Sequence, residues 1–113
     1  GQAHLGEALG HLLDNAIKFT PPDGWVRLRA RGSKRGAFIV VEDSGIGIPS
    51  ADLPRIFDRF YRVAKGAKSG SPGLGLHLVK KIVGAYGGQV SVRSRLAGGS
   101  AFRVALPAAA PQR

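Results

Sequence analysis

A polar stripe on the first helical segment carries the first residues that suggest chemistry. Helical spacing places Glu7, His11, Asn15 and Lys18 along one face of residues 4–19. An amide oxygen such as that of Asn15 is a hard ligand, suited to a magnesium ion that also binds phosphate oxygens. Lys18 lies one turn further on and could contact the same phosphates. By itself, the stripe fits a solvated helix face with a Glu7–His11 pair more simply than a ligand site.

A second group follows a buried strand and consists of Asp43, Gly45 and Gly47. A carboxylate at the end of a strand can accept a hydrogen bond from an exocyclic amine, and glycines allow a ligand to approach the backbone. A turn that leads to a helix capped by Ser50 explains the same residues without a ligand. A dinucleotide-binding fingerprint is excluded because the third glycine is missing and Pro49 stands where the helix should begin.

A third group is the glycine turn Gly73-Leu74-Gly75, which opens a helical segment. The free N–H groups of a helix's first turn are suited to phosphate, and the glycines equally suit close helix–sheet packing. A P-loop is excluded because no Gly-Lys pair opens this helix. The loop ahead of it is basic and could close over a triphosphate or simply face solvent. Its basic residues, with those just before it, are Arg55, Arg59, Arg62, Lys65 and Lys68.

The elements that must position these groups follow from hydrophobic spacing and turn residues. Helical periodicity predicts helices over residues 4–19 and 74–86 and a short helix over 52–58. Alternating or continuously apolar runs predict strands over 25–31, 37–42, 89–95 and 100–106. Because strands and helices do not alternate strictly, we expect an α+β fold. It would be a two-layer α/β sandwich with helices on one face of a mixed, mostly antiparallel sheet.

Composition limits the class of protein. The chain has 113 residues, 43% of them hydrophobic, and no cysteine, so we expect one domain without disulfides. No apolar run reaches the roughly 18 residues needed to cross a bilayer, and no signal peptide is visible, which predicts a cytoplasmic domain. The net charge of +10 fits solubility, a polyanionic ligand or an acidic partner. Nucleic acid is disfavoured because stacking aromatics are not interleaved with the basic residues.

A conventional catalytic set is absent from the sequence. The three histidines show no metal-binding spacing with carboxylates, and no Ser-His-Asp arrangement can be argued. The sequence does not assign a catalytic residue. Glu7 and His11 are the two residues that we consider as candidates for a catalytic role. The remaining pattern suits phosphoryl transfer, which needs positioning and charge neutralisation more than covalent chemistry.

Five segments in this order resemble the ATP-binding catalytic domain of bacterial two-component sensor histidine kinases, in the GHKL superfamily that includes gyrase B, Hsp90 and MutL. Residues 11–22 resemble the N box, 43–47 the G1 box, 56–62 the F box, 73–76 the G2 box and 99–102 the last glycine turn. The resemblance covers residues 4–107, and residues 57–61 separate histidine kinases from the other branches. It implies the Bergerat fold over residues 1–107, with a lid at about 59–72. The residues that follow show no periodicity, so we expect a disordered tail at 108–113.

Carried over by position, the resemblance implies that Asn15 binds magnesium, that Lys18 approaches phosphate and that Asp43 reads the adenine amino group. The implied ligands are therefore ATP and Mg²⁺. The other implied ATP contacts are Phe19 beside the base, Gly45, Gly47 and Ile48 at the adenine pocket, Arg59 and Arg62 in the lid, Gly73, Leu74, Gly75 and Leu76 at the phosphate turn, and Ser100.

The sequence departs from the family pattern at several positions. His11 stands where the family commonly has asparagine, and a hydrogen bond from it to phosphate would depend on pH. Ser71 and Pro72 replace a frequent Gly-Thr or Gly-Ser, and Pro72 lacks an N–H donor. The chain begins near the helix that bears Asn15, so we expect an N-terminally truncated fold that lacks the family's preceding strand.

The resemblance implies an activity that depends on other domains. No phosphoacceptor histidine followed by an acidic residue and then proline or threonine is present. We therefore expect the chain to bind Mg-ATP and to supply the γ-phosphate to a histidine on a separate dimerisation domain, which passes it to a response regulator. The alternative is a degenerate ATP-sensing module without kinase activity. We expect no nucleic-acid partner, a monomeric isolated domain, and a cytoplasmic location, either free or as part of a membrane-bound sensor.

Overall fold

The computed structural model describes residues 4–59, 61 and 74–108. Its elements follow the order α1 (Leu5–Lys18), β1 (Val26–Ser33), β2 (Gly36–Asp43), a 3-10 turn η1 (Leu53–Arg55), α2 (Leu74–Ala85), β3 (Gln89–Arg95) and β4 (Gly99–Pro107). The two long helices and four strands are confirmed to within two residues at each end. The short helix expected over 52–58 is wrong in extent, because its hydrogen bonds link residues three apart, as from Asp58 N–H to the carbonyl oxygen of Arg55.

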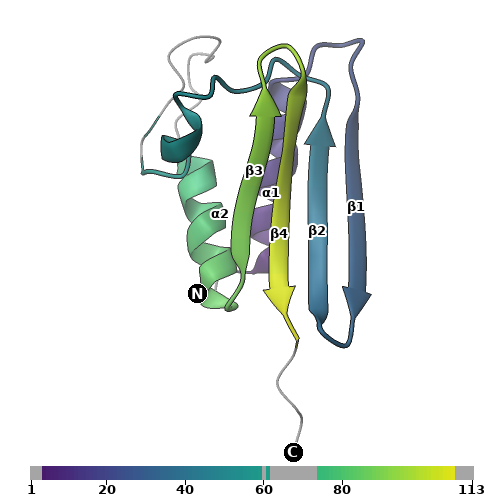
Figure 1. The fold of residues 1–113 in the computed structure, drawn as a ribbon, viewed down its shortest axis with the longest axis vertical. Coiled ribbons are helices and arrows are strands. Elements are labelled where there is room, and N and C mark those ends of the chain that lie inside the picture. The colour runs from purple at the N-terminus through teal and green to yellow at the C-terminus, as the bar shows by residue number, and fades with distance from the viewer. Residues whose placement is uncertain (1–3, 60, 62–73, 109–113) are drawn as a thin grey trace, which may run out of the picture.

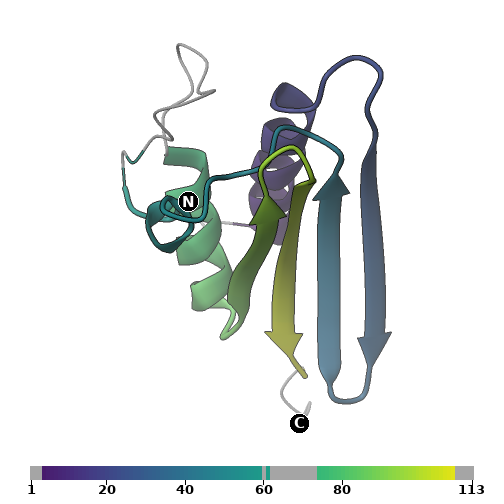
Figure 2. The ribbon, with the colours of Figure 1, turned by 45° about the horizontal axis from the view of Figure 1, so that its top comes forward.

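The four strands form one sheet in the order β1-β2-β4-β3, and every neighbouring pair is antiparallel. Both helices lie on one face of this sheet, and the opposite face is open (Figure 1, Figure 2). The predicted two-layer α+β sandwich is confirmed. Within the described residues the sheet is wholly antiparallel rather than mixed.

The core lies between the helices and the inner face of the sheet. Its buried apolar side chains are Ala8, Leu12, Ala16, Val41, Ile56, Val79, Ile82, Val83, Phe102 and Val104. The ring of Phe57 meets that of Phe102 edge-on, with centroids 6.2 Å apart, so the segment after η1 is anchored to the same core. The sheet, the two helices and the segment after η1 therefore share one hydrophobic core. The polar residues of the candidate site lie at the border of that core.

The apolar side of α1 that the sequence predicts is the side that enters the core. Ala8, Leu12 and Ala16 are buried, which turns the polar stripe of the helix away from the sheet. The helix ends after Lys18, where the hydroxyl of Thr20 donates to the carbonyl oxygen of Ala16 at 2.6 Å and Pro21 follows. Of the helices in the described part of the chain, none is long and apolar enough to cross a membrane.

Candidate nucleotide site

The C-terminal end of α1 is joined to the loop that follows β2. Phe19 closes the helix by donating its N–H to the carbonyl oxygen of Asn15 at 3.1 Å, and its own carbonyl oxygen accepts the N–H of Ile46 at 3.2 Å. Gly45 packs so closely that a Cβ atom there would overlap this carbonyl oxygen and lie 3.0 Å from the carbonyl carbon. A larger residue at position 45 would therefore separate α1 from the loop.

Asp43 places a carboxylate at this junction. It is the last residue of β2 and only 8% exposed, and it is the one buried charged side chain among the described residues. Its Oδ1 accepts the N–H of Gly45 at 2.8 Å. Burial raises the pKa of Asp43, while hydrogen bonds from the backbone of Gly45 and Ser100 act in the opposite direction. Because a carboxylate has about four acceptor positions, it can accept a further N–H from a ligand.

The turn between β3 and β4 holds the other side of the loop. The Oγ atom of Ser94 accepts the N–H of Ile48 at 2.7 Å, and it lies 2.7 Å from Oγ of Ser100 and 3.0 Å from the carbonyl oxygen of Gly99. One arrangement satisfies all three contacts, with Ser100 donating to Ser94 and Ser94 donating to Gly99. Ser100 is consequently fixed beside Asp43, its partner in the β2–β4 register.

Gly47 is required at its position by this same turn. Its φ angle is 76°, in the left-handed region that favours glycine. A Cβ atom there would also overlap the carbonyl oxygen of Arg95 and lie 2.6 Å from the carbonyl carbon. The glycines of the loop thus have a packing reason that holds with or without a ligand.

Helices α1 and α2 approach each other at the predicted phosphate turn. A Cβ atom on Gly75 would lie 3.5 Å from Nδ1 of His11, so the first turn of α2 lies against the polar stripe of α1. The Nε2 atom of His11 is buried with no hydrogen-bond partner among the described residues, and it lies 3.8 Å from Oε2 of Glu7. A buried polar atom without a partner costs free energy, which a polar ligand at this point would relieve.

The predicted site residues therefore form two clusters along α1. The first cluster contains Phe19, Asp43, Gly45, Gly47, Ile48 and Ser100, and the second contains Glu7, His11 and Gly75. Asn15 is half-buried and lies on α1 about one turn from each cluster.

The remaining predicted residues lie elsewhere. Lys18 is exposed at the end of α1, Leu76 packs against the core, and Leu74 is the first residue of α2. Arg59 is exposed after η1. Arg62 and Gly73 lie outside the described residues, as do most of the predicted lid and the end of the predicted tail, residues 109–113.

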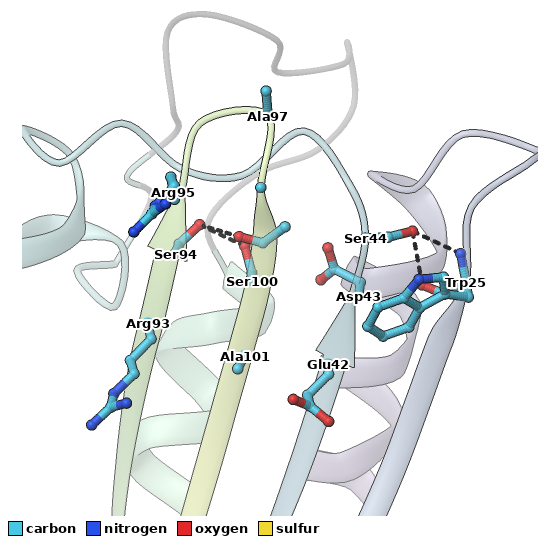
Figure 3. A pocket seen from close by; sticks show the side chains of 12 residues that line it. Trp25, Glu42, Asp43, Ser44, Arg93, Ser94, Arg95, Ala97, Ser100 and Ala101 are labelled. Carbon is cyan, nitrogen blue, oxygen red and sulfur yellow. Dashed lines mark hydrogen bonds between the residues drawn. The ribbon is translucent and has the colours of Figure 1, made fainter.

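Two contributors to the site were not predicted from the sequence. Ser94 binds the glycine loop. The sequence feature that could have indicated this is a polar residue at an inward-facing position of the alternating strand β3. Ser44 locks β1 to β2, since Trp25 N–H donates to its Oγ at 2.8 Å and its own N–H donates to the carbonyl oxygen of Trp25 at 3.0 Å. A hollow of about 440 Å³ opens nearby, with Trp25, Glu42 and Arg93 among its lining residues (Figure 3).

The fold and the comparisons with known proteins assign the chain to a class of ATPases. A family model described as histidine kinase-, DNA gyrase B- and HSP90-like ATPase matches residues 1–110, and the chain belongs to this family. Within the family, its relatives are sensor kinases, so the chain is an ATP-binding catalytic domain of the sensor histidine kinase type. The predicted family and fold are confirmed.

Similarity to individual sensor kinases is extensive across this chain. Sensor protein CiaH of Streptococcus pneumoniae is 39% identical over 114 residues, covering 99% of this chain and 26% of that protein. Sensor protein CreC of Escherichia coli is 42% identical over 97 residues, covering 86% of this chain and 20% of that protein. The chain therefore spans about a quarter or less of the length of these curated relatives.

Solved structures show the same fold. The mycobacterial sensor histidine kinase MprB superposes with a TM-score of 0.79 and 38% identity, covering 90% of this chain and 70% of that chain. Full-length ShkA, solved in complex with AMPPNP, superposes with a TM-score of 0.74 and 34% identity, covering 96% of this chain and 23% of that chain.

Proposed function

We propose that the chain binds Mg-ATP along α1 and delivers the γ-phosphate to a histidine on a separate dimerisation and phosphoacceptor domain of its parent protein. The phosphoryl group would then pass to a response regulator. The proposal covers one part of a longer sensor kinase whose catalytic portion is cytoplasmic. The isolated domain is monomeric in this proposal and binds no nucleic acid.

The observation that carries the proposal is the buried carboxylate of Asp43. It lies where the end of α1, the glycine loop and β4 meet, and its remaining acceptor capacity suits the exocyclic amine of adenine. Phe19 reaches the same junction through its carbonyl oxygen, and in this proposal its ring packs beside the base. The relative ShkA was solved in complex with AMPPNP, which is an ATP analogue. That complex supports a nucleotide as the ligand of this chain.

The phosphate end of the nucleotide would lie toward His11 and Gly75, at the start of α2. Asn15 would bind Mg²⁺ through its amide oxygen, and Lys18 would offset phosphate charge. No cluster of three or more histidine, cysteine or carboxylate side chains forms a metal site within the described residues. In this proposal magnesium would be held by the amide oxygen of Asn15 together with phosphate oxygens, and it would neutralise charge on the transferred group.

The transfer itself requires a group that this chain lacks. The bond between the β–γ bridging oxygen and the γ-phosphorus breaks, a bond from an imidazole nitrogen of the acceptor forms, and ADP leaves while the imidazole proton is released. Residues of the chain hold the nucleotide in line for this step and neutralise its charge.

The test joins the chain to the phosphoacceptor hairpin of its own parent protein and supplies ATP labelled at the γ-phosphate. We expect acid-labile label on the joined protein and none on the 113-residue chain alone. Asn15→Ala should abolish transfer, while Asp14→Ala, which changes the exposed neighbouring residue, should preserve it. Stable label on the chain alone, or full transfer by Asn15→Ala, would refute the proposal.

A degenerate ATP-sensing module is the second candidate, and it is favoured by the buried Nε2 of His11, which has no hydrogen-bond partner among the described residues. An imidazole is larger than the asparagine common in the family and places different atoms near the start of α2. In this case calorimetry detects Mg-ATP binding, but the joined protein transfers no phosphate. Transfer that appears only in His11→Asn would attribute the inactivity to this one residue.

A further inference from the structure

The open face of the sheet carries a concentration of arginine. Residues that alternate with the buried Val41 and Val104 point away from the helices. The charged side chains on this face are Arg27, Arg29, Arg31, Arg93, Arg95, Arg103 and Glu42. No lysine lies in any of the four strands, so the positive charge of the face comes from guanidinium groups alone.

Strand pairing arranges these side chains in rows across the sheet. One row runs Arg27, Glu42, Ala101, Arg93, and the next runs Arg29, Val40, Arg103, Ser91. Alternate residues on one strand lie about 7 Å apart, and like charges brought this near to one another repel. The face therefore carries a repulsive cost that an anionic partner would relieve.

Several of these guanidinium groups are already held in place. Oε1 of Glu42 forms ion pairs with two arginines, with Nε of Arg27 at 3.1 Å and with Nε of Arg29 at 3.2 Å. Arg103 stacks over the ring of Phe38, with its guanidinium carbon 4.7 Å from the centroid. Glu42 is the only acid among the described residues of the face, so six arginines share one carboxylate there. Three further arginines, Arg31, Arg93 and Arg95, form no ion pair with another described residue.

We propose that the open sheet face is a docking surface for an acidic protein segment, whose carboxylates pair with Arg31, Arg93 and Arg95. The planar guanidinium fork binds carboxylates through two parallel hydrogen bonds, which a lysine cannot do. Ala101 lies between Glu42 and Arg93 on the floor of the open hollow (Figure 3), where a side chain of the partner finds room. The hollow is also lined by Asp43, Ser94 and Ser100, so the upper end of this surface borders the adenine end of the proposed ATP site. The arginines themselves lie on the face opposite the helices, and their pairing with carboxylates is a function distinct from ATP binding.

Nucleic acid fits this face less well than protein. Single-stranded nucleic acid on an open four-stranded sheet needs exposed aromatic rings for base stacking. The rings here are Trp25 and Phe38, and an arginine already stacks on one side of each, Arg27 at 4.9 Å and Arg103 at 4.7 Å from the ring centroid. Trp25 remains 50% exposed, so the face offers one partly accessible ring beside six arginines.

The test measures fluorescence anisotropy of a labelled 12-residue oligo-glutamate peptide with the 113-residue chain in about 50 mM NaCl. Arg31→Glu/Arg93→Glu should weaken binding at least tenfold. Lys80→Glu/Lys81→Glu, which makes the same charge change on the exposed side of α2, should weaken it less than twofold. Circular dichroism and urea denaturation establish that both variants remain folded.

Four outcomes would overturn the proposal. Absence of peptide binding would show that the face does not dock an acidic segment. An equal loss in the two double variants would reduce the effect to net charge. Tighter binding of a 12-nucleotide oligo-thymidylate than of the peptide, lost in Arg31→Glu/Arg93→Glu, would assign the face to nucleic acid. Tighter binding of vesicles that contain phosphatidylserine, lost in the same variant, would assign it to a membrane surface.

Discussion

Asp43→Asn removes one negative charge from the proposed adenine site and preserves its shape. The amide oxygen can still accept the N–H of Gly45, now bound by Oδ1 at 2.8 Å. The other polar group of the asparagine side chain is an NH₂ group, which donates hydrogen bonds. It would face the adenine amine, which is also a donor, so no hydrogen bond could form between them. A hydrogen bond to a charged group contributes about 1.5–3 kcal/mol, so we expect the affinity for Mg-ATP to fall about 10- to 100-fold.

The same substitution should have the opposite effect on stability. Burial raises the pKa of Asp43, so the folded protein binds this proton more readily than the unfolded chain, in which an aspartate has a pKa of about 3.9. Stability therefore falls as pH rises from that value through the raised pKa, and the ionised carboxylate is a cost at pH 7. Asp43→Asn should raise the urea midpoint at pH 7 and lose this advantage below about pH 4.

The assay is calorimetric titration of Mg-ATP, with Glu42→Gln as the matched control. Glu42 is the preceding residue of β2, but it faces the open side of the sheet, where it pairs with Arg27 and Arg29. Its replacement removes the same charge and should leave the affinity within about twofold. Equal losses in the two variants would indicate a net-charge effect, and unchanged binding by Asp43→Asn would refute the adenine assignment.

Three further predictions concern the fold that supports the site. Gly47→Ala should lower the free energy of unfolding in urea by more than about 2 kcal/mol, because the new methyl meets the backbone of Arg95 at a positive φ. Gly10→Ala, in open space on α1, should raise it by about 0.5–1 kcal/mol, and equal effects would contradict the contact at Gly47. Leu12→Ala should cost about 2–5 kcal/mol, whereas Leu96→Ala, 61% exposed, should cost less than about 0.5 kcal/mol; similar costs would contradict the position of α1. Tyr61 donates its hydroxyl to Asp52, which raises the pKa of Tyr61, so Asp52→Asn should lower the pH at which one tyrosine ionises in a spectrophotometric titration, and an unaltered curve would contradict this hydrogen bond.

Much of the fold could be predicted from local patterns. Leu5, Leu9, Leu12 and their neighbours predict α1 because their spacing matches the helical period, and the structure buries that side. Strand alternation over 89–95 and 100–106 likewise predicts β3 and β4. The segment 52–58 was less predictable, because helical spacing over seven residues does not distinguish an α-helix from successive three-residue turns.

The reasons for the site glycines could not be read from the sequence. The sequence suggests that Gly45 and Gly47 make room for a ligand, but each also packs against a backbone carbonyl group, of Phe19 and of Arg95 respectively. Those partners lie 26 residues before Gly45 and 48 residues after Gly47 in the numbering. Contacts between such distant segments depend on strand order, which no local pattern contains.

The order of the segments around Asn15, Asp43 and Gly75 carries the resemblance that predicted the family. Hydrophobic spacing and turn residues predicted the helices and strands, because these patterns are local to each element. Tertiary structure alone decided that Ser94 holds the glycine loop. It also placed Nε2 of His11, which has no hydrogen-bond partner among the described residues, near the start of α2. It also decided that arginines from three strands share one open face. The physical reason is that pairing register and helix packing bring side chains together through space, whereas sequence spacing describes neighbours within a single element.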